Sequence, residues 1–148
     1  MGHEFSGEIV EIGKDVTNNW KIGERVCAMP QIGCAKCSNC RAGRPHRCDK
    51  GLNRATPGNP GAYSEFVRIG AQETFRLPDS VTFQEGALVE PLAVRLHAVK
   101  RAKITAGDNV LIVGGGPVRL SVAVWCKFFW SATYYCKRFD RGPGRTGR

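Results

Sequence analysis

Apolar residues in the first half of the chain recur with the short period of β-strands. Short apolar runs next to glycine occupy residues 8–12 and 25–28, and residues 62–69 alternate between apolar and polar side chains. A segment from about residue 30 to residue 60 is rich in glycine, proline and asparagine and predicts loops. We therefore expect a β-rich unit that is interrupted by a long loop.

The pattern becomes helical after residue 80. Thr82 and Glu85 fit a capping box, in which the hydroxyl and the carboxylate satisfy the first free amides of a helix. Pro91 is expected to break or restart that helix. Apolar residues with helical spacing then predict a second helix, and these are Leu92, Leu96 and Val99.

The last ordered pattern is a strand followed by a helix. Residues 109–113 form a short apolar run that ends in glycines, and a helical pattern extends from about Pro117 to Phe129. Aromatic residues between 128 and 135 suit either a transition from helix to strand or stacking on single-stranded nucleic acid.

The composition is that of a globular protein. The 148 residues are 42% hydrophobic, which is enough for one core. Arg119 and Lys127 interrupt the most apolar run, so no segment reaches the roughly 18 apolar residues that span a membrane. The chain opens without a signal-peptide pattern. We therefore expect a reducing cytoplasmic location, where cysteines favour metal binding over disulfides.

The net charge of +9 comes in good part from the end of the chain. Residues 137–148 hold five basic residues and one acidic residue, and we expect this basic tail to be disordered. Such a tail attracts anions without identifying a partner.

Four cysteines lie close together in the predicted loop, with the spacing C-x2-C-x2-C-x7-C, and they are Cys34, Cys37, Cys40 and Cys48. This spacing lets a loop bring four thiolates to the corners of a tetrahedron around zinc. An iron–sulfur cluster usually has a different last spacing, and two disulfides would need an oxidising compartment. Because a closed shell of four sulfurs leaves no place for a substrate, we expect a structural zinc here.

A second motif lies at the start of the chain, where residues 2–16 read GHEFSGEIVEIGKDV. This run resembles the zinc signature of the medium-chain dehydrogenase/reductase family, and the four-cysteine loop and a glycine-rich turn follow in the family's order. The resemblance extends from residue 2 to about residue 129. It implies a mixed β and α/β fold, with a GroES-like β-barrel fragment over residues 1–102 and the first βα unit of a Rossmann domain over residues 103–136.

The resemblance also implies a catalytic zinc site. His3 matches the family's imidazole ligand, and Glu4 matches the neighbouring carboxylate that binds the metal directly or through water. Glu90 matches a glutamate of the polyol, threonine and butanediol dehydrogenases. The implied activity is hydride transfer between an alcohol or polyol and NAD or NADP, with zinc stabilising an alkoxide.

The implied cofactor site is the turn after residue 113, with Gly114, Gly116, Pro117 and Val118. Glycines there let the backbone approach a pyrophosphate at the start of a helix. Arg119 departs from the motif because it replaces the third glycine, and it is expected to push the helix away or disrupt the turn.

Other departures follow the glycine turn or lie nearby. Arg95 and Trp130 stand where relatives usually have a small residue. The acidic residue that would bind the ribose hydroxyls is missing, while Arg138 and Asp140 lie near its place, so the choice between NAD and NADP stays open.

Members of the family carry about fifty residues before this motif, including a cysteine ligand, and a full dinucleotide-binding domain after it. We therefore expect an internal piece of a dehydrogenase, truncated at both ends and inactive by itself. The full-length relatives are commonly homo-oligomers.

The alternative is a zinc-stabilised binding module. Basic side chains around the cysteine loop would contact the phosphates of nucleic acid, and they are Arg41, Arg44, Arg47, Lys50 and Arg54. This alternative explains the charge, but it explains neither the motif at residue 2 nor Glu90 nor the glycine turn.

Overall fold

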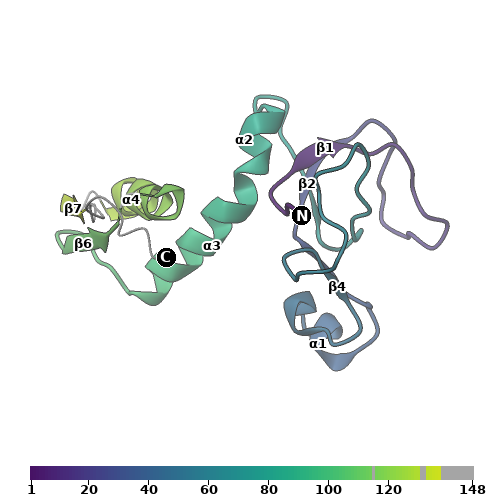
Figure 1. Ribbon diagram of the computed structural model, residues 1–148, viewed down its shortest axis with the longest axis horizontal. Coiled ribbons are helices and arrows are strands. Elements are labelled where there is room, and N and C mark those ends of the chain that lie inside the picture. The colour runs from purple at the N-terminus through teal and green to yellow at the C-terminus, as the bar shows by residue number, and fades with distance from the viewer. Residues whose placement is uncertain (115, 131–132, 138–148) are drawn as a thin grey trace, which may run out of the picture. The chain divides into compact units, whose positions relative to one another are not determined.

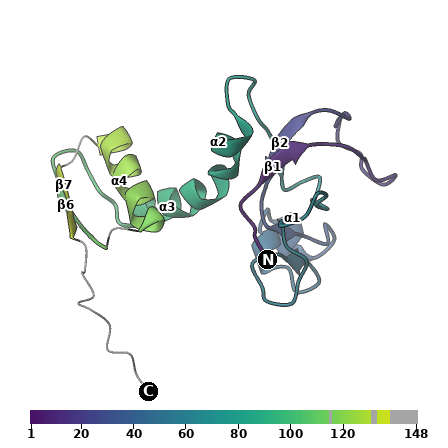
Figure 2. The ribbon, with the colours of Figure 1, turned by 45° about the horizontal axis from the view of Figure 1, so that its top comes forward.

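The computed structural model describes residues 1–114, 116–130 and 133–137 (Figures 1 and 2). The chain divides into two compact units, one from Met1 to Glu90 and one from Pro91 onward. The boundary predicted at residue 102 stays a prediction.

An antiparallel sheet of three strands forms the centre of the first unit, in the order β1 (Ser6–Glu8), β2 (Arg25–Ala28) and β5 (Thr74–Arg76). The middle strand is β2, the predicted strand at residues 25–28, and its last three residues are buried. The predicted strand at 8–12 forms two residues earlier. Its pairing continues past β1, because Ile9 donates to the carbonyl of Glu24 over 3.0 Å.

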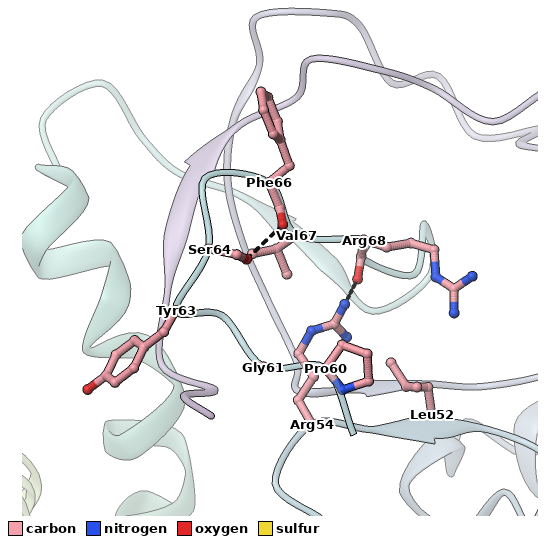
Figure 3. A pocket seen from close by; sticks show the side chains of 9 residues that line it. All are labelled: Leu52, Arg54, Pro60, Gly61, Tyr63, Ser64, Phe66, Val67 and Arg68. Carbon is pink, nitrogen blue, oxygen red and sulfur yellow. Dashed lines mark hydrogen bonds between the residues drawn. The ribbon is translucent and has the colours of Figure 1, made fainter. Parts of the chain in front are cut away.

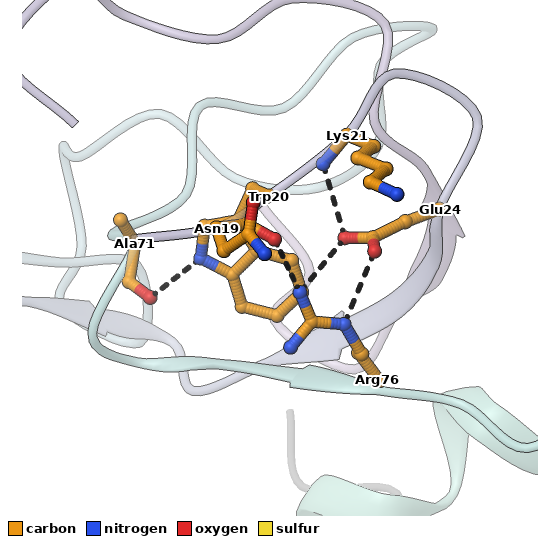
Figure 4. Close-up of polar contacts among 6 residues, drawn as sticks. All are labelled: Asn19, Trp20, Lys21, Glu24, Ala71 and Arg76. Atoms are coloured by element: carbon orange, nitrogen blue, oxygen red, sulfur yellow. Dashed lines mark hydrogen bonds and ion pairs between the residues drawn. The ribbon is translucent and has the colours of Figure 1, made fainter. Parts of the chain in front are cut away.

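An ion pair joins β5 to the residue that precedes β2. Arg76 at the end of β5 lies 3.2 Å from a carboxylate oxygen of Glu24, just before β2, and its guanidinium lies over the ring of Trp20 (Figure 4). The hydrogen bond from Arg76 lowers the pKa of Glu24. The indole nitrogen of Trp20 in turn donates to the carbonyl of Ala71, which fixes the segment before β5.

The resemblance implied a β-barrel fragment for this unit, and the described residues do not form a closed barrel. Strands β3 (Gln31–Ile32) and β4 (Leu52–Asn53) pair only with each other, as a separate two-stranded sheet. A three-stranded sheet keeps two open edges, and closure needs more strands with a consistent tilt. The fold of this unit is therefore mixed and β-rich, and the barrel prediction is not met.

The predicted strand at residues 62–69 is wrong. Ala62 and Tyr63 donate to the carbonyls of Gly2 and Met1, but the segment then turns, and the Ser64 hydroxyl donates to the carbonyl of Phe66 over 2.8 Å (Figure 3). Such local bonds compete with a strand ladder. The alternating pattern also lacks a buried face, because Tyr63 is 80% and Phe66 72% exposed.

The loop between residues 30 and 60 contains two short helical segments, α1 (Ser38–Arg41) and η1 (Pro45–Arg47). The thiol of Cys37 caps α1 by accepting a hydrogen bond from the amide of Cys40. The loop predicted from its glycines and prolines is therefore confirmed, with its turns built around the cysteines.

Helix α2 (Phe83–Ala87) begins with the predicted capping box. The Thr82 hydroxyl accepts from the Glu85 amide over 3.2 Å, and a Glu85 carboxylate oxygen accepts from the Thr82 amide over 2.8 Å. The Ser6 hydroxyl of β1 donates to the carbonyl of Phe83 over 2.5 Å. A side chain at Gly86 would meet Leu77 and Ser6, so only glycine lets α2 lie this close to β1.

Helix α3 (Val89–Arg101) restarts directly after α2. The break falls at Leu88, before the residue predicted to cause it, and Pro91 lies in the first turn of α3. Proline is tolerated there because its missing N–H would have no partner in the helix.

The second unit contains the predicted strand and helix, β6 (Asn109–Val113) and α4 (Pro117–Trp130), and adds β7 (Thr133–Lys137). Strands β6 and β7 pair in parallel, as in a βαβ connection. The Trp125 indole nitrogen of α4 donates to the carbonyl of Leu92 over 2.8 Å.

The aromatic segment therefore makes the predicted transition from helix to strand. Lys137 ends β7, and the rest of the predicted basic tail, residues 138–148, lies outside the described residues. Within the described part of the chain, no helix has the length and apolar character that a membrane crossing needs.

Candidate metal centres and glycine turn

The four cysteines of the loop come together as predicted. One sulfur atom from each of Cys34, Cys37, Cys40 and Cys48 lies within 4.8 Å of all the others. Sulfurs at the corners of a tetrahedron with bonds of about 2.3 Å to zinc lie about 3.8 Å apart, and those of Cys37 and Cys48 are 3.9 Å apart. The donor set and its spacing therefore suit a closed zinc site.

Backbone amides already point at these sulfurs. The amide of Cys37 donates to the Cys34 sulfur and the amide of Cys40 to the Cys37 sulfur, each over 3.4 Å. Backbone N–H groups of Lys36 and Cys37 lower the pKa of the Cys34 thiol to about 6, whereas burial, followed by hydrogen bonds with Cys37 and Cys48, raises that of Cys40 to about 12. A metal ion that binds all four sulfurs must displace the Cys40 proton.

A buried carboxylate that the sequence did not single out supports this loop. Glu73 is 5% exposed and accepts a hydrogen bond from the Gly33 amide over 3.1 Å. A Cβ atom at Gly33 would lie 2.8 Å from the Cys40 sulfur and 3.0 Å from the Glu73 carboxylate. The absence of a side chain at Gly33 therefore leaves room for the Cys40 sulfur and the Glu73 carboxylate next to its backbone. No sequence pattern predicts this arrangement.

The residues predicted for a second metal site also meet. One donor atom from each of His3, Glu4 and Glu90 lies within 4.8 Å of the other two. His3 Nε2 and Glu90 Oε2 are 4.0 Å apart, and their side chains are 38% and 17% exposed. Two ligands with bonds of about 2 Å to one ion lie at most about 4 Å apart, so this pair stands at the limit of that reach.

The fold explains why residues so distant in sequence meet. His3 and Glu4 directly precede β1, and Glu90 lies in the first turn of α3, directly after α2. The hydrogen bond from Ser6 to Phe83 joins β1 to α2. The contact between these two elements therefore carries Glu90 to His3.

The glycine turn keeps part of the predicted motif. Gly114 has φ +110°, a conformation that residues with side chains rarely adopt, and α4 begins at Pro117, followed by Val118. Both features are present despite Arg119, while Gly115 between them lies outside the described residues. The described helix also starts where the motif places it.

Arg119 lies against the turn. Its Nε donates to the carbonyl of Val113 over 2.8 Å, and a Cβ atom at Gly114 would lie 2.4 Å from that nitrogen. The arginine therefore fills the space where the motif brings the helix and the strand together. Arg95, the second departure, has an Nε that is buried without a partner among the described residues.

The remaining candidates have ordinary positions. His46 and His97 are exposed, and Cys27 and Cys126 are buried. Of the basic residues in the alternative binding module, Arg54 is only 5% exposed. It therefore does not belong to an exposed surface that could contact the backbone of nucleic acid. The other members of that group are exposed, namely Arg41, Arg44, Arg47 and Lys50.

The sequence of residues 1–79 matches the family profile of the alcohol dehydrogenase GroES-like domain, more than half of the chain. The chain belongs to this family. The resemblance to the zinc-dependent medium-chain dehydrogenases and reductases is therefore confirmed.

Individual relatives agree with the family. The chain is 41% identical over 132 residues to a probable D-xylulose reductase A of Aspergillus fumigatus, a match that covers 89% of this chain and 37% of the relative. It superposes on 2R,3R-butanediol dehydrogenase of Bacillus subtilis with a TM-score of 0.74 at 37% identity, over 92% of this chain and 38% of that one.

A third similar structure is a putative zinc-binding dehydrogenase of Sinorhizobium meliloti bound to NADP. Its TM-score is 0.77 at 32% identity, over 90% of this chain and 39% of that one. This chain thus spans about two fifths of the length of the relatives that it matches.

Replacing Cys40 tests the sulfur site. We expect Cys40→Ser to lower the bound zinc by about one ion per chain and to lower the Tm, because a structural zinc contributes its binding free energy to folding. Zinc would be measured by elemental analysis and the Tm by calorimetry. Lys36→Ala, at an exposed position in the same loop, is the matched control, and equal zinc in both variants would contradict the assignment.

Proposed function

We propose that this chain is part of a zinc-dependent oxidoreductase that transfers hydride between an alcohol or polyol and a nicotinamide cofactor. The observation that carries this proposal is the meeting of His3 and Glu90 at 4.0 Å from opposite ends of the first unit. The alcohol dehydrogenase family and the names of the relatives, a xylulose reductase and a butanediol dehydrogenase, support it.

The donor set of His3, Glu4 and Glu90 fits a catalytic zinc. Three protein ligands leave one coordination position open, in contrast to the closed set of four cysteines. When bound, zinc would supply Lewis-acid stabilisation of an alkoxide. The residues of the chain would orient the ion, and the two carboxylates would balance its charge.

The cofactor site would be the turn between β6 and α4, as the start of a Rossmann domain. Gly114, Gly116, Pro117 and Val118 would lie beside the pyrophosphate, with the amides at the start of α4 facing it. When bound, the nicotinamide would accept or return the hydride. Arg119 does not fit this group, because its side chain fills the space that the third glycine leaves free.

Counting metal ions separates the enzyme from a binding module. An oxidoreductase site predicts close to two zinc ions per chain, and the binding module predicts one. We expect Glu90→Gln to lose the second, weaker ion while it keeps the sulfur-bound one, since an amide is a poorer ligand than a carboxylate. Titration calorimetry with zinc would measure this loss, with Glu65→Gln at an exposed position as the control.

Alcohol binding tests the substrate class without turnover. With Co²⁺ in place of zinc, we expect xylitol or 2,3-butanediol to change the visible absorption spectrum of the wild-type chain, because a hydroxyl enters the open coordination position. Glu90→Gln should show no such change, and a spectrum unchanged in the wild type would contradict the proposal. With the chain alone we expect no NAD(P)H formation above background from a panel of polyols.

Restoring the third glycine tests the cofactor site. We expect Arg119→Gly to bind NADH or NADPH at least tenfold more tightly than the wild type, because it clears the space beside Gly114. Cofactor fluorescence on binding would give the Kd. Lys127→Gly, at an exposed position nearer the end of α4, controls for the loss of charge and of helix propensity. Weaker cofactor binding by Arg119→Gly than by the wild type would show that the guanidinium assists the phosphates instead.

A further inference from the structure

A pocket of about 550 Å³ opens in the first unit, and none of the four clustered cysteines lines it (Figure 3). The segment from Pro60 to Arg68 forms most of its wall, and Leu52 and Arg54 complete it. Its volume lies within the roughly 300–1,000 Å³ that is usual for small-molecule sites. None of the residues that line it belongs to the proposed metal sites or to the glycine turn.

One of the residues that line this pocket is a buried arginine. Arg54 is only 5% exposed, and its Nη2 donates to the backbone carbonyl of Arg68. Its Nε and Nη1 are buried and have no hydrogen-bond partner among the described residues. A buried donor without a partner destabilises the fold, and more so when the group is charged.

Within the part of the chain that the structure describes, no acidic side chain forms an ion pair with Arg54. The ion pairs found among the described residues join His3 to Glu90 and Arg76 to Glu24, and neither involves Arg54. Burial lowers the pKa of Arg54, and the positive charge of Arg68 lowers it further.

We propose that Arg54 binds the oxyanion of a small molecule, a carboxylate or a phosphate, that enters this pocket. A bound oxyanion would accept hydrogen bonds from the unpaired nitrogens and neutralise the buried charge, and the planar guanidinium suits both groups. Leu52, Pro60 and Val67 line the same pocket and would contact the apolar part of such a ligand. This site uses none of the proposed metal ligands, although the Tyr63 amide donates to the carbonyl of Met1, close to His3.

Thermal unfolding of the zinc-loaded chain tests the proposal. We expect sodium phosphate to raise the Tm of the wild type in a saturable manner, beyond the effect of sodium chloride at the same ionic strength. Sodium acetate forms the second arm, and the anion with the lower apparent Kd identifies the source of the oxyanion. A Tm that responds to neither anion more than to chloride would overturn the proposal.

Arg54→Met separates a binding role from a structural one. If the guanidinium serves to bind a ligand, Arg54→Met should have an unchanged or higher Tm without anion, because it removes an unpaired buried charge. Its apparent Kd for the anion should also rise at least tenfold. A lower Tm together with a retained anion response would assign Arg54 to structure alone and overturn the proposal.

Two further variants complete the test. Arg101→Met removes one exposed charge at the end of α3 and should respond to phosphate like the wild type. Arg54→Lys keeps the charge and gives a folded comparison should the methionine variant fail to fold. Arg54→Lys should broaden the ³¹P line of inorganic phosphate less than the wild type does. Equal broadening by the two proteins would contradict a role for the guanidinium.

Discussion

The contact between β1 and α2 is the interaction on which the candidate active centre depends. Ser6 donates to the carbonyl of Phe83 over 2.5 Å, and Gly86 lets the helix backbone lie against Ser6. The capping box at Thr82 fixes where α2 begins, so the position of Glu90 beyond its end is fixed as well. Through this chain of local constraints, a loop residue near the N-terminus faces a helix residue from the far end of the unit.

The two candidate metal centres obtain their geometry in different ways. The cysteine site is local, because α1 and η1 fold the loop so that the amide of Cys37 and that of Cys40 support neighbouring sulfurs. The site at His3 and Glu90 instead requires the sheet and two helices to form first. The positions of His3 and Glu90 are therefore only as rigid as the packing between β1 and α2.

The sequence predicted the features that carry their own local signal. Spacing identified the cysteine cluster, and the family motif identified His3 and Glu90, whose proximity the structure then showed. It failed where tertiary context decides: residues 62–69 alternate like a strand yet turn at Ser64, and strands of two or three residues such as β3 and β5 are too short to show a period. Arg54 looked like one more basic loop residue, because burial leaves no trace in the local pattern.

Glu73 ties the cysteine loop to the central sheet. Its carboxylate accepts from Gly33 beside the loop, its backbone carbonyl accepts from Met29 just after β2, and β5 begins at the next residue. A disturbance of the sulfur cluster is thus transmitted to the sheet edge within a single residue. Oxidation of one thiol would loosen the scaffold of the whole first unit and not merely the surface loop that carries it.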